Sequence, residues 1–203
     1  MEGDSSDLPE KGTKSSLRRE LLDARRGLTP EETGEAAAAL ARHALELPEL
    51  TSARTVAAYV SVGREPGTRA LIDALRTRGV RVLLPVLLAD NDLDWAEYRG
   101  GDRLAPAGRG LLEPDGPRLG PGAVREADAV LLPGLAVDER GMRLGRGGGS
   151  YDRVLERLEA ASTHPALVVL LYPNEVVARV PEEPHDHPVH AVVTPQGVRR
   201  FAA

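Results

Sequence analysis

The stretch AVLLPGLAVDERGMRLGRGGGSYDRVLERLEA, residues 129–160, decides the fold class. It begins with a continuous apolar run at 129–133, which has the length and composition of a buried strand. It leads into the segment 151–161, where three apolar residues fall on one face of a helix. Residues 134–149 between them are rich in glycine. A buried strand that leads through such a loop into a helix is typical of a parallel α/β sheet.

The same alternation of helices and apolar strands continues outward in both directions. It predicts a single α/β domain over residues 13–203, with a mostly parallel sheet, helices on both faces and Rossmann-like three-layer architecture. Residues 1–12 lack periodicity and are predicted to be a disordered N-terminal tail. Residues 99–122 contain seven glycines and four prolines, which predicts a long loop of the kind that is often functional. Strands are predicted at 55–62, 80–88, 93–98, 129–133, 167–171 and 189–194, and helices at 13–26, 29–47, 68–78 and 151–161.

Composition excludes several classes of protein. The chain of 203 residues is 41% hydrophobic and 28% charged, which is typical of a globular domain. Its net charge of −5 argues against a general nucleic-acid binder, which normally carries a basic excess. The chain has no cysteine, so disulfides, thiolate metal sites and cysteine nucleophiles are excluded. With no long apolar run and no apolar leader, we expect no membrane association and a cytoplasmic location.

The glycine loop has the chemistry of an anion site. Gly145, Gly147, Gly148 and Gly149 precede the helix, and glycines let backbone amides approach a phosphate while the helix N-terminus adds partial positive charge. Two arginines within the loop, at 143 and 146, add positive charge. The loop is neither a Walker A motif nor the dinucleotide fingerprint, because the lysine of the first and the third glycine of the second are missing. The alternative is a flexible turn.

Other charged residues allow two interpretations each. Asp152 either stabilises the first turn of its helix or holds Mg²⁺ beside a phosphate. Lys14 and Arg18 lie four residues apart on one helix face, with Arg25 on the same face, and form either a solvated basic surface or a phosphate-binding one. The only tryptophan, Trp95, is either core or a stacking surface. The histidines at 185, 187 and 190 together with Asp186 indicate either a transition-metal cluster or an extended surface loop.

Three segments resemble the 5-formyltetrahydrofolate cyclo-ligase family. The stretch PGLAVDERGMRLGRGGGSYDRVL, from residue 133, is similar to the family pattern PGLAFD-x-x-G-x-RLG-[RY]-G-x-G-Y-Y-D. KSSLR at 14–18 resembles the family's N-terminal Lys-x-x-x-Arg helix, and PEEPHDHPVHAVVT at 181–194 resembles its closing segment. The resemblance spans about residues 13 to 198. The chain departs from the family pattern at four places: Ser150 replaces a tyrosine, Val137 a phenylalanine, His190 an aspartate, and Asn174-Glu175 stands where a glutamine is usual.

The resemblance implies a role for each candidate residue. Lys14, Arg18, Arg143 and Arg146 are expected to be catalytic cations. The folate would contact Val60, Glu65 and Tyr151, with Tyr172 a weaker aromatic candidate, and Asp152 and Asp186 would hold Mg²⁺. The residues expected to bind ATP are Lys14, Arg18, Gly145, Arg146, Gly147, Gly148, Gly149, Ser150, Tyr151 and Asp152.

The activity that the resemblance implies is an ATP-dependent ring closure. 5-Formyltetrahydrofolate would become 5,10-methenyltetrahydrofolate, with release of ADP and phosphate, through phosphorylation of the formyl oxygen. ATP is then the co-substrate, Mg²⁺ the metal and the folate the small-molecule partner, and the protein is expected to be a monomer or a weak homodimer. The alternative is a non-catalytic nucleotide- or folate-binding protein of the same fold.

Overall fold

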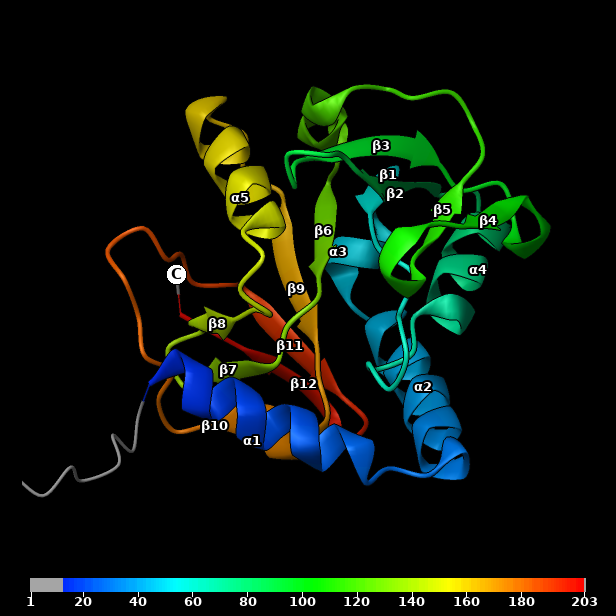
Figure 1. The fold of residues 1–203 in the computed structure, drawn as a ribbon. Helices are drawn as coiled ribbons and strands as arrows, with labels where there is room; N and C mark the ends of the chain where they lie inside the picture. The colour runs from blue at the N-terminus through cyan, green and yellow to red at the C-terminus, as the bar shows by residue number, and fades with distance from the viewer. Residues whose placement is uncertain (1–12, 203) are drawn as a thin grey trace, which may run out of the picture.

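A seven-stranded sheet runs through the middle of the protein in the computed structural model, which describes residues 13–202 (Figure 1). The strand order is β12-β11-β9-β6-β1-β2-β3. The five inner strands are parallel, and the two edge strands β3 and β12 are antiparallel to their neighbours. The predicted mostly parallel sheet is therefore confirmed. The strands are β1 (Thr55–Ala57), β2 (Arg81–Leu87), β3 (Leu93–Glu97), β6 (Ala129–Leu132), β9 (Ala166–Leu170), β11 (Ala191–Thr194) and β12 (Gly197–Arg200).

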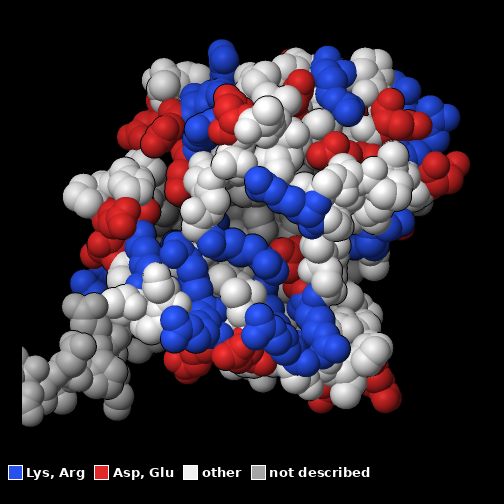
Figure 2. Space-filling model, in the orientation of Figure 1, with Lys and Arg blue, Asp and Glu red and all other residues white. Residues whose placement is uncertain are grey.

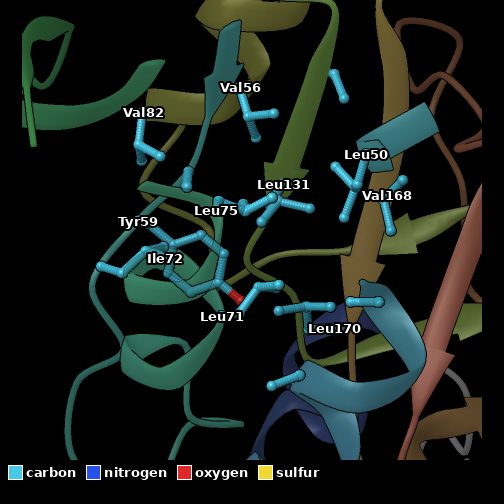
Figure 3. Close-up of a cluster of buried hydrophobic side chains, with 14 of the residues drawn as sticks. Leu50, Val56, Tyr59, Leu71, Ile72, Leu75, Val82, Leu131, Val168 and Leu170 are labelled. Carbon is cyan, nitrogen blue, oxygen red and sulfur yellow. The ribbon is translucent and has the colours of Figure 1, made fainter. Parts of the chain in front are cut away.

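Helices cover both faces of this sheet, as the alternating pattern predicts. One face packs against α2, α3 and α4, and Figure 3 shows the side chains that meet there, among them Leu50, Leu71 and Leu131. The other face packs against α5 and the 3₁₀ helix η3 (Pro121–Glu126). None of the described helices is both long and apolar enough to span a membrane. The helices are α1 (Lys14–Arg26), α2 (Pro30–Ala44), α3 (Pro48–Thr51), α4 (Arg69–Thr77) and α5 (Ser150–Ala160).

A small second sheet carries α1. Strands β7 (Ala136–Asp138), β8 (Arg143–Leu144) and β10 (Val176–Val177) pair in the order β10-β7-β8. Leu21 of α1 packs on this sheet, and Figure 1 shows the helix lying across its strands. The buried Asp138 holds the β7–β8 turn, because its carboxylate accepts hydrogen bonds from the backbone amides of Arg140 and Met142. The arrangement fixes α1 beside the end of β6.

The structure corrects several predicted boundaries. The strand predicted at 55–62 ends at Ala57, and the helix predicted at 29–47 ends at Ala44. The glycine-rich segment contains β7 and β8, and the predicted long loop contains a hairpin of β4 (Leu104–Pro106) and β5 (Leu112–Pro114). Strands of two or three residues leave no periodic pattern, which is why they were missed. The predicted tail at 1–12 lies outside the described residues.

Candidate active site

A cleft of about 400 Å³ opens where the parallel strands end. It is lined by Pro85 and Leu87 of β2, Val60 after β1, and Pro133 and Gly134 after β6. Open α/β sheets bind ligands at this edge. In Figure 2, Lys and Arg side chains gather around the hollow. Apart from the weaker candidate Tyr172, its lining includes every residue assigned above to catalysis, ATP, folate or Mg²⁺: Lys14, Arg18, Val60, Glu65, Arg143, Gly145, Arg146, Gly147, Gly148, Gly149, Ser150, Tyr151, Asp152 and Asp186.

The glycine loop joins β8 to α5 along one wall of this cleft. Gly147 (φ +95°) and Gly149 (φ +80°) adopt left-handed conformations that other residues rarely take. Gly149 is also the N-cap of α5, and no side chain caps the helix. The N-terminal amides of α5 therefore face the cleft without a side-chain partner, as an anion-binding helix start requires.

Arg143 is the most deeply buried cation of the wall. Its side chain is 8% exposed, and it donates a hydrogen bond to the Pro133 carbonyl at 2.9 Å. Burial lowers the pKa of Arg143, and the neighbouring Asp152 carboxylate, 3.6 Å away, opposes that shift. The arrangement fixes one positive charge beside the first turn of α5.

Helix α1 brings further cations to the glycine loop. Arg18 donates from Nε to the Gly145 carbonyl at 2.8 Å. Lys14 donates to Asp186 Oδ2 at 2.9 Å. Seven residues after Arg18, Arg25 is buried and pairs with Glu175 at 2.7 Å. All three residues of the predicted face therefore point into the protein, and only Lys14 and Arg18 line the cleft.

Asp186 is held as a carboxylate by its neighbours. Burial raises its pKa, but the hydrogen bonds from Lys14 and from the Glu183 amide outweigh burial and leave the pKa below its ordinary value. The described residues contain no group of three or more His, Cys, Asp or Glu that could hold a metal ion. His185 faces Glu183, His187 faces Glu159, and His190 Nδ1 accepts from the Leu167 amide, so the three histidines have separate partners.

The side of the cleft nearest β1 carries Glu65 and Tyr151. Glu65 is 12% exposed; one carboxylate oxygen accepts from the Val62 amide at 2.8 Å and the other lies 3.3 Å from Arg146 Nη2. The Tyr151 hydroxyl is buried and has no hydrogen-bond partner among residues 13–202. Burial, followed by the charge of Glu65, raises its pKa, so it stays protonated as a donor for a ligand.

Two aromatic candidates lie away from the cleft. Trp95 on β3 is fully buried in the core, which confirms the first of its two interpretations. Tyr172 packs against the Arg25 guanidinium and donates its hydroxyl hydrogen to the Arg64 carbonyl.

Sequence reasoning missed a set of lining residues whose only signal was the glycine- and proline-rich composition of their loop: Arg109, Leu111, Leu112 and Glu113.

Comparison with known proteins agrees with this arrangement. The profile of the 5-formyltetrahydrofolate cyclo-ligase family matches residues 10–195. The 5-formyltetrahydrofolate cyclo-ligase of Mycolicibacterium smegmatis is 44% identical over 191 residues, which cover 91% of this chain and 94% of that protein. The Escherichia coli K12 protein of the same name is 35% identical over 176 residues, covering 86% and 96%.

The fold comparison points the same way. The solved structure of Aquifex aeolicus 5,10-methenyltetrahydrofolate synthetase superimposes with a TM-score of 0.79 at 28% identity, covering 94% of this chain and 93% of that one. The family profile, the sequence relatives and the architecture thus agree over nearly the whole length. The chain belongs to the 5-formyltetrahydrofolate cyclo-ligase family.

Proposed function

We propose that this protein converts 5-formyltetrahydrofolate to 5,10-methenyltetrahydrofolate and in the same reaction converts ATP to ADP and phosphate. The observation that carries the proposal is the contact between Arg146 of the glycine loop and Glu65, 3.3 Å apart. A wall suited to phosphate and a pocket suited to a nitrogen heterocycle therefore meet within one cleft. Phosphoryl transfer from ATP to a folate needs both in contact.

The formyl oxygen of the substrate is a poor leaving group and must be activated before the ring can close. The oxygen of the formyl group carried by nitrogen 5 attacks the terminal phosphorus of ATP, the bond to ADP breaks, and an iminium phosphate forms. Nitrogen 10 then attacks the former formyl carbon, its proton is lost, and inorganic phosphate leaves with the oxygen to give the methenyl ring. The transition state carries charge on the transferring phosphoryl group, so positioned cations are the main catalytic requirement.

The positions of the cations support the roles proposed for them. Lys14, Arg18, Arg143 and Arg146 hold the phosphates, assisted by the amides from Gly145 to Asp152. Arg143 is the fixed charge, because its guanidinium is buried and bonded to Pro133. Arg146 is 56% exposed and is the mobile one, able to leave Glu65 for a phosphate when substrate binds.

The folate pocket follows from hydrogen-bonding capacity. The Glu65 carboxylate accepts hydrogen bonds, and a reduced pterin ring presents N–H donors. The Tyr151 hydroxyl needs an acceptor that the described protein does not supply, and a ligand can provide it. Val60, 8% exposed, gives an apolar surface beside them.

The residues present also fit a magnesium ion. When bound with ATP, Mg²⁺ neutralises charge on the phosphates. Asp152 would hold it: its carboxylate is 47% exposed, lies on the cleft wall and follows the glycine loop directly. Asp186 lines the same cleft and is the second carboxylate, although it already accepts hydrogen bonds from Lys14 and the Glu183 amide.

The direct test is the absorbance of the methenyl product after Mg²⁺, ATP and 5-formyltetrahydrofolate are mixed with the protein. We expect product that depends on all three additions. Binding of ATP and folate without turnover would instead support a non-catalytic binding protein.

A further inference from the structure

The β4–β5 hairpin forms a wall of the cleft that the roles above do not use. Figure 1 shows it on the opposite side of β6 from the glycine loop. Its base is fastened, because Glu113 Oε1 accepts a hydrogen bond from the Leu87 amide of β2 and the amide of Asp115 donates to the Arg103 carbonyl. Its tip, residues 107–111, contributes Arg109 and Leu111 to the cleft lining.

Arg109 has a backbone conformation that needs explaining. Its φ is +61°, in the left-handed region that a non-glycine residue rarely adopts. It lies between Gly108 and Gly110, yet the residue at this strained position is an arginine. Strained residues persist where surrounding structure holds them, and they concentrate at ligand sites.

Arg109 also differs from the other cations of the cleft in its partners. Lys14, Arg18, Arg143 and Arg146 each contact an acidic side chain or a backbone carbonyl. Arg109 is exposed and forms no ion pair with the described residues. Its one polar contact in that part of the chain is a long hydrogen bond, 3.4 Å, to Asn91 Oδ1.

Apolar side chains connect Arg109 to the pocket around Glu65. The same cleft that contains Arg109 and Glu65 is lined by Pro85 and Leu87 of β2, Leu93 of β3, and Leu111 and Leu112 of the hairpin. A ligand that fits this wall has a flat polar ring at one end, an apolar middle and an anionic group at the other end. A folate has this order: the pterin, the aminobenzoyl ring and a glutamate with carboxylates.

We propose that Arg109, presented by the hairpin tip, binds the glutamate carboxylates of the folate. The inference rests on the proposed function and adds to it the residue that binds the end of the substrate opposite the pterin. A carboxylate is favoured over the ATP phosphates because the four other cations already surround the glycine loop, whereas Arg109 belongs to a different wall. A guanidinium binds a carboxylate through two parallel hydrogen bonds.

The test compares two substrates that differ only in the anionic end. Steady-state kinetics are measured with 5-formyltetrahydrofolate and with 5-formyltetrahydropteroate, which lacks the glutamate. The variant is Arg109→Asn, because asparagine tolerates the left-handed conformation and so preserves the turn. Arg109→Lys retains the charge without the two-pronged geometry. Arg42→Gln, on the exposed surface of α2, is the control for net charge.

We expect Arg109→Asn to raise the KM for the glutamate-bearing substrate by roughly 5-fold, the scale of losing an exposed guanidinium–carboxylate pair. The KM for the pteroate analogue and for ATP should change little, Arg109→Lys should be intermediate, and added salt should shrink the difference between the substrates. Arg42→Gln should behave like the original protein.

Three results would overturn the proposal. The first is an equal rise in the KM for 5-formyltetrahydrofolate and for the pteroate analogue in Arg109→Asn. The second is a rise in the KM for ATP without a rise for either of these substrates, and the third is no change in any KM. If the unaltered protein itself makes no methenyl product from 5-formyltetrahydrofolate and ATP, the proposed function fails. That outcome is distinguishable, because it appears before any variant is compared.

Discussion

Arg25 and Glu175 form a buried ion pair, with 2.7 Å between Arg25 Nε and Glu175 Oε2 and side chains that are 4% and 0% exposed. Arg25 also donates to the Gly134 carbonyl, and Glu175 accepts from the Tyr172 amide. The pair therefore ties α1 to the ends of β6 and β9. Glu175 is one of the four departures from the family pattern, and its partner is now identified.

Replacing one partner of this pair should be costly. Arg25→Met leaves the Glu175 carboxylate buried without a counter-charge and should lower the free energy of unfolding by about 3 kcal/mol, measured by urea denaturation. The double variant Arg25→Met/Glu175→Met should recover part of that loss, since two apolar side chains of similar volume can replace a buried pair. A double variant that is no more stable than Arg25→Met alone would contradict this account.

The same variant should show a defined pH dependence. Burial raises the pKa of Glu175 above its ordinary 4.5, and the hydrogen bonds from Arg25 oppose that shift. Without Arg25 the pKa rises further, so folding favours the protonated acid. The Arg25→Met protein should therefore lose stability as the pH rises from 4.5 toward the raised pKa, and its deficit should be smallest at acidic pH.

Two glycines of the loop provide a matched pair. Gly147 has φ +95°, and an added Cβ would lie 3.2 Å from Arg18 Cζ, whereas Gly148 has no atom within 4 Å of that position. Gly147→Ala should therefore cost about 1–2 kcal/mol in backbone strain and displace Arg18, raising the KM for ATP. Gly148→Ala is the milder change. Equal effects of the two substitutions on the KM for ATP would mean that loop conformation does not govern nucleotide binding.

Substitution of Asp152 tests whether its carboxylate holds Mg²⁺. Asp152→Asn preserves size and polarity but removes the charge, so kcat should fall at least ~10²-fold, the scale of losing one electrostatic element of the transition state. Folding should survive, because the carboxylate is half exposed. Glu156→Gln, on the exposed face of the same helix, is the control. Normal turnover of the Asn variant at limiting Mg²⁺ would remove Asp152 from the metal site.

Replacing Lys14 should affect the KM for ATP more than the free energy of unfolding. Its ion pair with Asp186 is partly exposed, at 21% and 14%, so Lys14→Met should cost about 1 kcal/mol or less. The KM for ATP should rise several-fold, because a point charge beside the phosphates is lost. Arg19→Met on the exposed side of α1 is the control, and an ATP dependence shared by both variants would return Lys14 to a surface role.

The sequence predicts the parts of the fold that carry a periodic pattern. Residues 129–133 and 151–161 lie within one residue of β6 and α5, because each buries a continuous apolar face. The helix predicted from residue 29 does begin there, where Thr29 and Glu32 form a capping box, the side-chain pairing typical of a helix N-terminus. The β4–β5 hairpin and the small sheet of β7, β8 and β10 escape prediction, since strands of two or three residues depend on tertiary pairing.

The residues of the candidate site also divide into those that the sequence indicates and those that only the folded structure brings together. Side chains inside a long motif, such as Arg143, Arg146 and Tyr151, could be named from the sequence. Arg109 could not, because its proposed role rests on a turn conformation and on a hairpin that is hydrogen-bonded to β2. The partner of Arg25 was equally hidden, since 150 residues separate it from Glu175.

The proposed chemistry is tested most directly by following the formyl oxygen. Substrate carrying ¹⁸O in the formyl group is incubated with the protein, Mg²⁺ and ATP, and the label is located by mass spectrometry. In the proposed function the phosphate-binding loop meets the folate pocket where Arg146 and Glu65 lie 3.3 Å apart, so the formyl oxygen should be phosphorylated and leave in phosphate. We expect labelled inorganic phosphate and unlabelled ADP. Unlabelled phosphate formed together with normal methenyl product would contradict the account.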